Sequence, residues 1–190
     1  MADRFKRLFD LLLAMVATAV LLVPIVIVAL LVRLSSPGPV LYWSDRVGVR
    51  NRIFRMPKFR TMKTGTPAVA THLLNDPDVW LTPVGGFLRK TSLDELPQLW
   101  SILAGDMSFV GPRPALFNQH DLIALRTEKG VDALVPGLTG WAQVNGRDEL
   151  SILDKVALDA EYLRSRSLWL DLRIIVLTFL KVVRSEGVSH

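Results

Sequence analysis

The sequence contains no cysteine among its 190 residues and only three histidines, which are His72, His120 and His190. A chain without cysteine has no disulfide framework, no thiolate metal site and no thiol nucleophile. The histidines lie far apart and none falls in a spacing such as H-E-x-x-H, so a catalytic zinc site is not expected. The common glycine-rich nucleotide cradles, G-x-x-x-x-G-K-[ST] and G-x-G-x-x-G, are also absent. Any nucleotide must therefore be held by another arrangement of residues.

The net charge of the chain is +5. A basic chain attracts nucleic acid, anionic lipid or phosphorylated small molecules. The arginines are scattered among glycine and proline turns and do not line one helix, and no finger, ribonucleoprotein or basic-zipper pattern is present. We therefore expect no nucleic-acid partner.

Residues 11–32 form a run without any charged side chain. A helix of this length would measure about 30 Å, close to the hydrocarbon thickness of a bilayer. A secretory signal has a shorter apolar region followed by a small-residue cleavage site. The run is longer and lacks a convincing cleavage site, so we interpret it as a retained membrane segment.

Pro24 lies just past the middle of this run, where it removes a backbone hydrogen bond and bends or breaks a helix. Basic residues flank the run on both sides. Because basic flanks mark the cytoplasmic side of a membrane, a helix that breaks at Pro24 and returns to its own face satisfies both flanks. A kinked crossing helix is the alternative.

The remainder of the chain predicts a helix-rich α+β domain. We assign residues 1–34 to the re-entrant membrane segment and 35–190 to one catalytic domain, because the length allows one domain of ordinary size. The pattern predicts short strands at residues 40–43 and 52–56 about a turn at Gly48, a loop over 63–78, and helices over 96–103 and 149–164.

Residues 168–183 are rich in apolar side chains but carry Asp171, Arg173 and Lys181. The segment is too short and too charged to cross a bilayer. It suits an amphipathic helix lying in the headgroup plane, or equally a core helix of the domain.

The densest cluster of reactive groups lies at residues 89–98. Pro97 is tolerated only in the first turn of a helix, so a helix start near residues 93–95 is expected. The local pattern alone favours Asp94 as a helix cap. The functional alternative is that Asp94, kept ionised by Arg89 and Lys90, attacks a bound phosphate as a nucleophile, while Glu95 points roughly 100° away and serves another group.

Two further clusters carry groups suited to a nucleotide. Arg113 stands between two prolines that fix the backbone, so its guanidinium is either presented to a diphosphate or solvated in a rigid turn. In residues 136–147, small residues allow close backbone approach to a ligand, and Gln143 and Asn145 offer hydrogen bonds to a base or sugar.

At these clusters the sequence resembles the monotopic phosphoglycosyl transferases, the small form of the bacterial sugar transferase family. The matching motifs occur in order over almost the whole chain. They are RLFD at residues 7–10, SPGPV at 36–40, KFRTM at 58–62, RKTSLDELPQL at 89–99, GDMSFVGPRP at 105–114 and PGLTGWAQVNGR at 136–147.

The resemblance implies an enzyme with a helix-break-helix in one leaflet and its domain on the cytoplasmic face of the bacterial inner membrane. Such enzymes move a sugar 1-phosphate from a UDP-sugar to undecaprenyl (polyprenyl) phosphate and release UMP. The resemblance implies that Asp94 is the nucleophile, that it forms a covalent phosphosugar intermediate and that it contacts Mg²⁺. It also implies that Glu95 assists Asp94. It places Lys58, Arg89, Arg113 and Arg147 in or near the phosphate and nucleotide sites.

The chain departs from the family at the break, where many small members have Ser-Pro and this sequence has Val23-Pro24. Two other readings compete with the enzyme. A non-catalytic membrane adaptor of the same fold would be free to lose Asp94 and Glu95, which this chain retains. A membrane-surface protein would use its basic patches to bind anionic lipid. A homodimer is left open.

Overall fold

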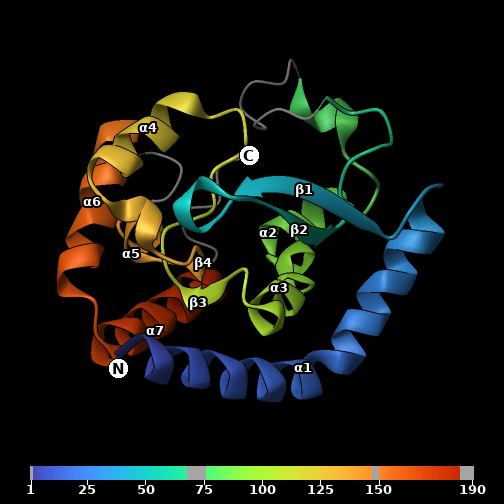
Figure 1. Ribbon diagram of the computed structural model, residues 1–190. Helices are drawn as coiled ribbons and strands as arrows, with labels where there is room; N and C mark the ends of the chain where they lie inside the picture. The colour runs from blue at the N-terminus through green and yellow to red at the C-terminus, as the bar shows by residue number, and fades with distance from the viewer. Residues whose placement is uncertain (1, 68–75, 147–149, 185–190) are drawn as a thin grey trace.

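The computed structural model describes residues 2–67, 76–146 and 150–184, and it shows a long N-terminal helix beside a helix-rich α+β domain, as predicted (Figure 1). Its helices and strands are α1 (Ala2–Ser35), β1 (Leu41–Val47), β2 (Ile53–Phe59), α2 (Gly85–Lys90), α3 (Gln98–Ala104), β3 (Ser108–Val110), α4 (His120–Glu128), β4 (Gly137–Thr139), α5 (Trp141–Val144), α6 (Ile152–Ser165) and α7 (Leu168–Arg184).

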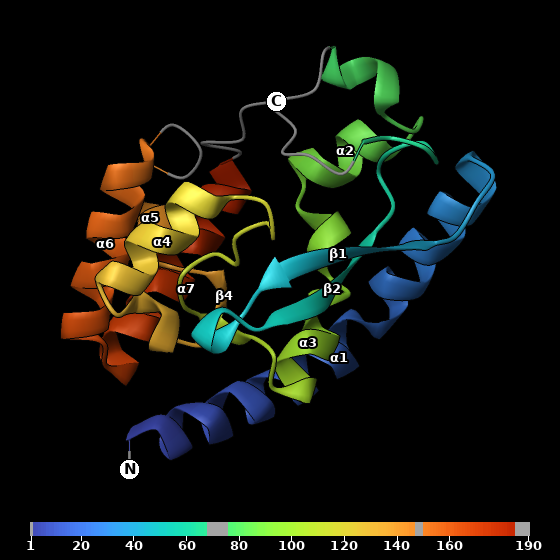
Figure 2. The ribbon, with the colours of Figure 1, turned by 45° about the horizontal axis from the view of Figure 1, so that its top comes forward.

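The hairpin of β1 and β2 forms the centre of the molecule. Figure 2 shows α4, α5, α6 and α7 gathered at one end of it, with α2 above it and α3 below it in that view. The strands are antiparallel, with Leu41 opposite Phe59 and Val47 opposite Ile53, so both extend beyond the predicted ranges. The turn between them uses Arg50 and the next residue in the left-handed region, at φ 52° and 59°.

A second, parallel pair of short strands joins two of the sequence motifs. Ser108 of β3 lies opposite Gly137 of β4. A Cβ atom on Gly111 would lie 2.3 Å from the carbonyl oxygen of Val135, and one on Gly140 would lie 2.1 Å from that of Gly111. These glycines therefore allow the two backbones to approach more closely than any side chain permits.

Helix α1 stays helical through Pro24, and Figure 1 shows it as one bent rod. Among the described residues, Arg4–Ser35 is the one segment that is long and apolar enough to cross a membrane by length and composition. The expected separation into two helices is thus replaced by a bend. A proline inside a helix removes one hydrogen bond and can kink it, while packing on both sides of the bend preserves the remaining turns.

One face of α1 packs against the domain along its length. Ala14, Val28 and Val32 are buried there, and Ile25 joins the core that includes Phe59. The opposite face is apolar and exposed. The exposed apolar side chains of α1 are Phe5, Leu8, Leu12, Met15, Val16, Val20, Leu22, Val23, Val26, Ile27, Leu30, Leu31 and Leu34.

Charged residues ahead of the apolar run dock the start of α1 onto the domain. Lys6 pairs with Asp171 of α7 at 2.6 Å. Arg7 donates to the carbonyls of Ile102 and its neighbour at the end of α3, and Asp10 accepts a hydrogen bond from the backbone of Phe109. The first motif of the sequence is therefore a docking element.

Helix α7 combines the two alternatives left open by its sequence. Asp171 and Ile174 are buried, and Asp171 also accepts a hydrogen bond from the Tyr162 hydroxyl at 2.6 Å. The other face exposes apolar side chains, including Trp169 and Phe179. The helix is thus part of the core on one face and suited to a lipid surface on the other.

Candidate active site

Asp94 lies in a single 3-10 turn, Leu93–Glu95, between α2 and α3. The expected helix start at these residues is wrong, because α3 begins only at Gln98, after Pro97. The cap position of the turn is occupied by Ser92, in the left-handed region at φ 56°, and no side chain caps the turn or α3. The capping interpretation of Asp94 is therefore wrong, and its buried carboxylate is not used to start a helix.

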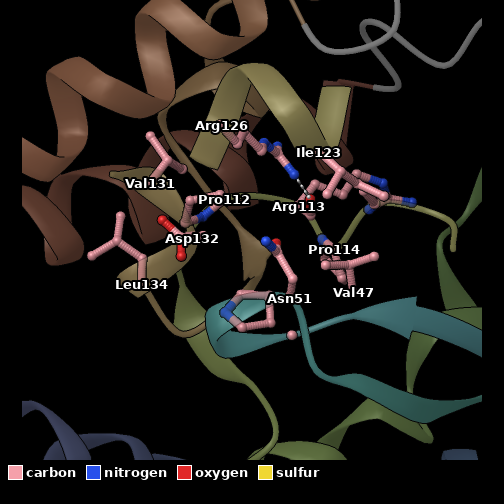
Figure 3. A pocket seen from close by; sticks show the side chains of 13 residues that line it. Val47, Asn51, Pro112, Arg113, Pro114, Ile123, Arg126, Val131, Asp132 and Leu134 are labelled. Atoms are coloured by element: carbon pink, nitrogen blue, oxygen red, sulfur yellow. Dashed lines mark hydrogen bonds between the residues drawn. The ribbon is translucent and has the colours of Figure 1, made fainter. Parts of the chain in front are cut away.

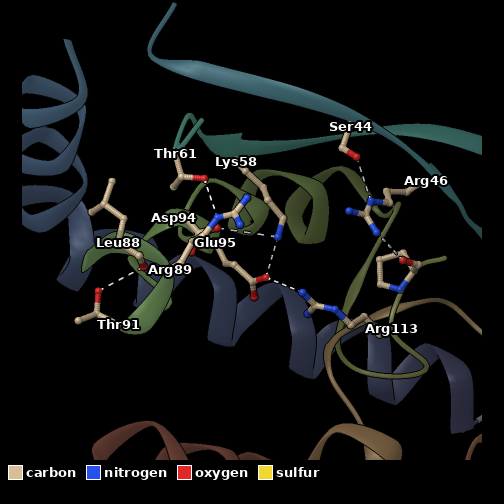
Figure 4. A network of polar contacts seen from close by, with 11 residues as sticks. Ser44, Arg46, Lys58, Thr61, Leu88, Arg89, Thr91, Asp94, Glu95 and Arg113 are labelled. Atoms are coloured by element: carbon tan, nitrogen blue, oxygen red, sulfur yellow. Dashed lines mark hydrogen bonds and ion pairs between the residues drawn. The ribbon is translucent and has the colours of Figure 1, made fainter. Parts of the chain in front are cut away.

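The Asp94–Glu95 pair meets basic side chains from two distant segments (Figure 4). Glu95 Oε1 lies 2.8 Å from Lys58 Nζ and 2.9 Å from Arg113 Nη2. Asp94 Oδ2 lies 4.0 Å from the same Lys58 Nζ. The structure thus brings together four of the predicted site residues, and the two carboxylates share a lysine.

Arg89 approaches Asp94 from α2. Its Nε donates to the hydroxyl of Thr61 at 3.0 Å, and its positive charge acts on Asp94. Thr61 is fixed in turn, because its carbonyl accepts a hydrogen bond from the backbone of Thr82 at 2.9 Å. A Cβ on Gly85 would lie 2.1 Å from that carbonyl, so the start of α2 must lack a side chain there.

The two adjacent carboxyl groups have pKa values shifted in opposite directions. Burial raises the pKa of Asp94, Lys58 lowers it and the charge of Glu95 raises it, with a net rise. Burial would also raise the pKa of Glu95, but Arg113 and Lys58 together hold it below its ordinary value of 4.5. Glu95 is therefore a firmly ionised counter-ion, while the protonation of Asp94 responds to its surroundings.

The backbone of the loop that carries Arg113 is held by hydrogen bonds from two other arginines. Arg126 donates to the carbonyl of Arg113 at 2.8 Å, and the same guanidinium pairs with Asp159 of α6 at 2.7 Å. Arg46 of β1 donates to the carbonyl of Pro114 at 3.2 Å. Sequence reasoning missed these three supporting residues. An acid at position 159, among the apolar positions of α6, was the available signal, because a buried acid requires a partner.

A small pocket lies between the hairpin turn and the loop that carries Arg113 (Figure 3). It has about 30 Å³ of space for water-sized groups, and Asn51, Pro112, Arg126 and Asp132 are among its lining residues. Pockets for drug-sized ligands usually measure about 300–1,000 Å³. This pocket is therefore too small for a nucleotide sugar, and the Asp94–Glu95 cluster is the candidate site.

The motif at residues 136–147 includes β4 and α5, and α5 packs against α6 and α7. Asn145 donates to the carbonyl of Trp141 at 2.8 Å and closes the helix. Both polar side-chain atoms of Gln143 are buried without a partner among the described residues. Within that part of the chain, no hydrogen bond or ion pair joins Gln143 or Asn145 to Asp94, and Arg147 lies outside it.

The acidic pair is the part of this site suited to a divalent cation. The described residues contain no cluster of three or more His, Cys, Asp or Glu side chains. Mg²⁺ nevertheless often takes only one or two carboxylates and completes its shell with substrate phosphates and water. Asp94 and Glu95 therefore fit a magnesium ion that arrives with a phosphorylated substrate.

Comparison with known proteins identifies the family. The model of the family described as "Bacterial sugar transferase" matches residues 1–185. The chain is 44% identical over 187 residues to the uncharacterized sugar transferase EpsL of Bacillus subtilis (strain 168), covering 97% of this chain and 90% of that protein. The chain therefore belongs to the bacterial sugar transferase family, and it is an enzyme of this class.

Relatives with named activities match over nearly the whole chain but are longer. The UDP-glucose:undecaprenyl-phosphate glucose-1-phosphate transferase of Escherichia coli (strain K12) is 41% identical over 93% of this chain and 39% of its own length. The UDP-N-acetylgalactosamine-undecaprenyl-phosphate N-acetylgalactosaminephosphotransferase of Aeromonas hydrophila is 36% identical over 96% of this chain and 44% of its own. The chain thus spans less than half the length of these two relatives.

Proposed function

We propose that this enzyme transfers a sugar 1-phosphate from a UDP-sugar to undecaprenyl phosphate and releases UMP. One observation carries the proposal, the convergence of cationic side chains on the buried acidic pair. Among the described residues, the charges of Lys58, Arg89, Arg113 and Arg46 act on one or both of its carboxylates. Cationic groups gathered beside a carboxylate can hold the phosphate oxygens of a donor diphosphate.

Asp94 is the nucleophile of the proposed reaction. One of its carboxylate oxygens attacks the β-phosphorus, the bond from that phosphorus to the bridging oxygen breaks, and UMP leaves with the bonding electrons. The phosphosugar then remains on Asp94 as an acyl phosphate. An oxygen of the lipid phosphate attacks the same phosphorus and frees the carboxylate. Handling two phosphorylated substrates in turn avoids holding both anions together in one small site.

Glu95 orients the basic residues in this proposal. A carboxylate that assists Asp94 could orient the lipid phosphate or deprotonate it. A carboxylate whose pKa is held below its ordinary value is a weak proton acceptor. Its contacts with Lys58 and Arg113 instead fix those two side chains around the space beside Asp94.

We further propose that Mg²⁺ takes part, with Asp94 as its protein contact. When bound, the ion would offset negative charge on the phosphate oxygens. Lys58 and Arg89 would supply the remaining positive charge on the protein side. A substrate-borne ion agrees with a site that offers only two carboxylates among the described residues.

The packing of α1 supports a proposal for its place in the membrane. Both halves of the helix pack on the same domain, Ala14 before the bend and Val28 and Val32 after it. A helix held in this way cannot cross a bilayer without drawing the domain into it. We propose that α1 lies within one leaflet as a re-entrant segment, with its exposed apolar face in lipid and the domain on the cytoplasmic face of the bacterial inner membrane.

The exposed apolar face of α7 supports the same arrangement as an interfacial helix. An acceptor with an insoluble tail presents its phosphate at the headgroup level. A site carried by a domain docked on α1 would meet the phosphate there.

A UMP-release assay tests the function. The full chain in detergent or nanodiscs is incubated with a panel of UDP-sugars, undecaprenyl phosphate and Mg²⁺, with Asp94→Asn as the inactive control. We expect UMP release from at least one donor. A folded protein that releases no UMP from any donor would instead support the adaptor, and salt-sensitive liposome binding without turnover would support the lipid-binding reading.

A further inference from the structure

Arg46 shares a face of the hairpin with a residue of the proposed active site. Side chains alternate along a strand, so Tyr42, Ser44 and Arg46 point to one face of β1. Tyr42 lies opposite Lys58 in the register of the hairpin, which places Lys58 on the same face. Figure 4 shows Arg46 directed toward the loop that carries Arg113.

The contacts of Arg46 use part of its hydrogen-bonding capacity. Its Nε donates to the Ser44 hydroxyl at 3.0 Å, and its Nη1 donates to the Pro114 carbonyl at 3.2 Å. No residue in the described part of the chain accepts a hydrogen bond from its Nη2. A guanidinium has five N–H donors in a planar fork, so Arg46 retains donors for a further acceptor.

The charges around Arg46 favour an anion as the further hydrogen-bond acceptor. Burial and the nearby charge of Arg113 lower the pKa of Arg46 to about 10, and Glu95 opposes them only in part. Glu95 is already shared between Lys58 and Arg113. Two partly buried guanidiniums held near each other are stabilised when an anion binds between them.

We propose that Arg46 binds the phosphate group of the donor that leaves with UMP, together with Arg113. The inference rests on the proposed function and assigns a residue to one half of the diphosphate. Lys58 Nζ lies 4.0 Å from Asp94, so Lys58 belongs with the phosphate under attack. Arg113 contacts Glu95, and Arg46 holds the loop of Arg113 and lies on the side of Arg113 away from Asp94 (Figure 4), which places Arg46 at the next phosphate along.

Binding of UMP and of uridine by the full chain, measured by calorimetry, tests this assignment. We expect Arg46→Gln to weaken UMP binding by about tenfold or more, because a hydrogen bond to a charged group is lost. Uridine lacks the phosphate, so its affinity should change less than about twofold. Arg55→Gln is the matched control, since Arg55 lies on the same hairpin but stacks over Trp43; it should change neither affinity.

A purely structural role, in which Arg46 acts only by positioning Arg113, makes a different prediction. In that case Arg46→Gln would have no further effect on UMP binding once Arg113→Gln is present, and this result would overturn the proposal. Direct binding requires a further loss in the double variant. If Arg46→Gln does not fold, Arg46→Lys replaces it in the test. We expect Arg46→Lys to lose part of the affinity for UMP and to keep the affinity for uridine. An unchanged affinity for UMP would contradict the proposal. A failure of the proposed function is distinct, since wild type would then release no UMP.

Discussion

Arg126 donates a hydrogen bond to the main-chain carbonyl of Arg113 at 2.8 Å. The same side chain forms two hydrogen bonds to one oxygen of Asp159, whose side chain is 1% exposed. A buried ion pair behind the loop therefore holds the backbone of Arg113, while its side chain reaches Glu95 on the other side. The loop that carries the Arg113 guanidinium is thus anchored by the core of the domain.

This anchor predicts a large stability effect for Asp159→Asn. Removing one partner of a buried ion pair leaves the other charge uncompensated, which typically costs about 3–5 kcal/mol. Thermal unfolding in detergent should show a clear drop in Tm. The double variant Arg126→Met with Asp159→Leu removes both charges and should be more stable than Asp159→Asn. If the single variant unfolds like wild type, the pair does not support the loop.

The second prediction concerns the side chain of Arg113. Its guanidinium contacts Glu95 and is proposed to bind the donor diphosphate, which suits a planar fork better than a point charge. We expect Arg113→Lys to lose activity nearly as strongly as Arg113→Ala, by about tenfold or more in kcat/KM for the donor. A lysine variant with a rate near wild type would show that a positive charge at this place is sufficient.

The third prediction uses the shifted pKa of Asp94. Lys58 is the largest influence that lowers this pKa, against the effect of burial. Replacing Lys58 by Gln removes a positive charge near the carboxylate, so the pKa of Asp94 must rise further above its ordinary value of 3.8. A nucleophilic carboxylate has to be ionised, and activity is lost as the pH falls through its pKa. The acidic limb of the pH–rate profile for UMP release should therefore move to higher pH in Lys58→Gln.

Lys63→Gln is a suitable control for this experiment, because Lys63 donates to the carbonyl of Val79 and has no contact with Asp94 among the described residues. Its acidic limb should coincide with that of wild type. An unshifted limb in Lys58→Gln would mean that the ionisation of another group controls the profile.

The sequence predicted Asp94, Glu95 and Arg113 from local chemistry, and the family resemblance added Lys58. These four residues lie in three short blocks, and the structure brings them together. The role of Asp94 was harder to predict, because an acid before a helix has the same local pattern whether it caps the helix or catalyses a reaction. Only the three-dimensional packing, in which α3 begins at Gln98, excludes the cap.

Arg46 could not be predicted, because its partner on the loop of Arg113 is a distant backbone carbonyl, which has no sequence pattern. Arg126 holds a similar carbonyl, and its one signal in the sequence was the acid at position 159. Pro24 shows a related limit. The residue indicates a disturbed helix, but the surrounding contacts decide between a bend and a break, and here the packing of Ile25 and Val28 on the domain preserves the helix.

The fourth prediction tests the position of α1 in the membrane. Because both ends of the helix are docked on one domain, residue 2 and the domain should lie on the same side. We expect an impermeant thiol reagent added to intact spheroplasts to label neither Ala2→Cys nor Glu128→Cys, and to label both after lysis. Glu128 serves as the domain marker because its side chain is 64% exposed. Labelling of Ala2→Cys alone from outside would contradict the re-entrant arrangement.

The last prediction concerns the covalent step on Asp94. If Asp94 carries the phosphosugar between the two half-reactions, enzyme given donor alone should release UMP in a burst of about one equivalent. Intact-mass spectrometry of the same sample should show a gain of one phosphosugar. Asp94→Asn removes the nucleophile and should show neither the burst nor the added mass.

Glu95→Gln separates orientation from nucleophilic attack within the same scheme. This variant retains Asp94, so it should still form the adduct. It loses the charge that holds Lys58 and Arg113 in place, so transfer of the phosphosugar to undecaprenyl phosphate should be slow. Initial rates measured at several concentrations of both substrates provide an independent test. A two-step exchange gives parallel double-reciprocal lines, whereas intersecting lines without a donor-only burst would require a ternary complex in which Asp94 is never phosphorylated.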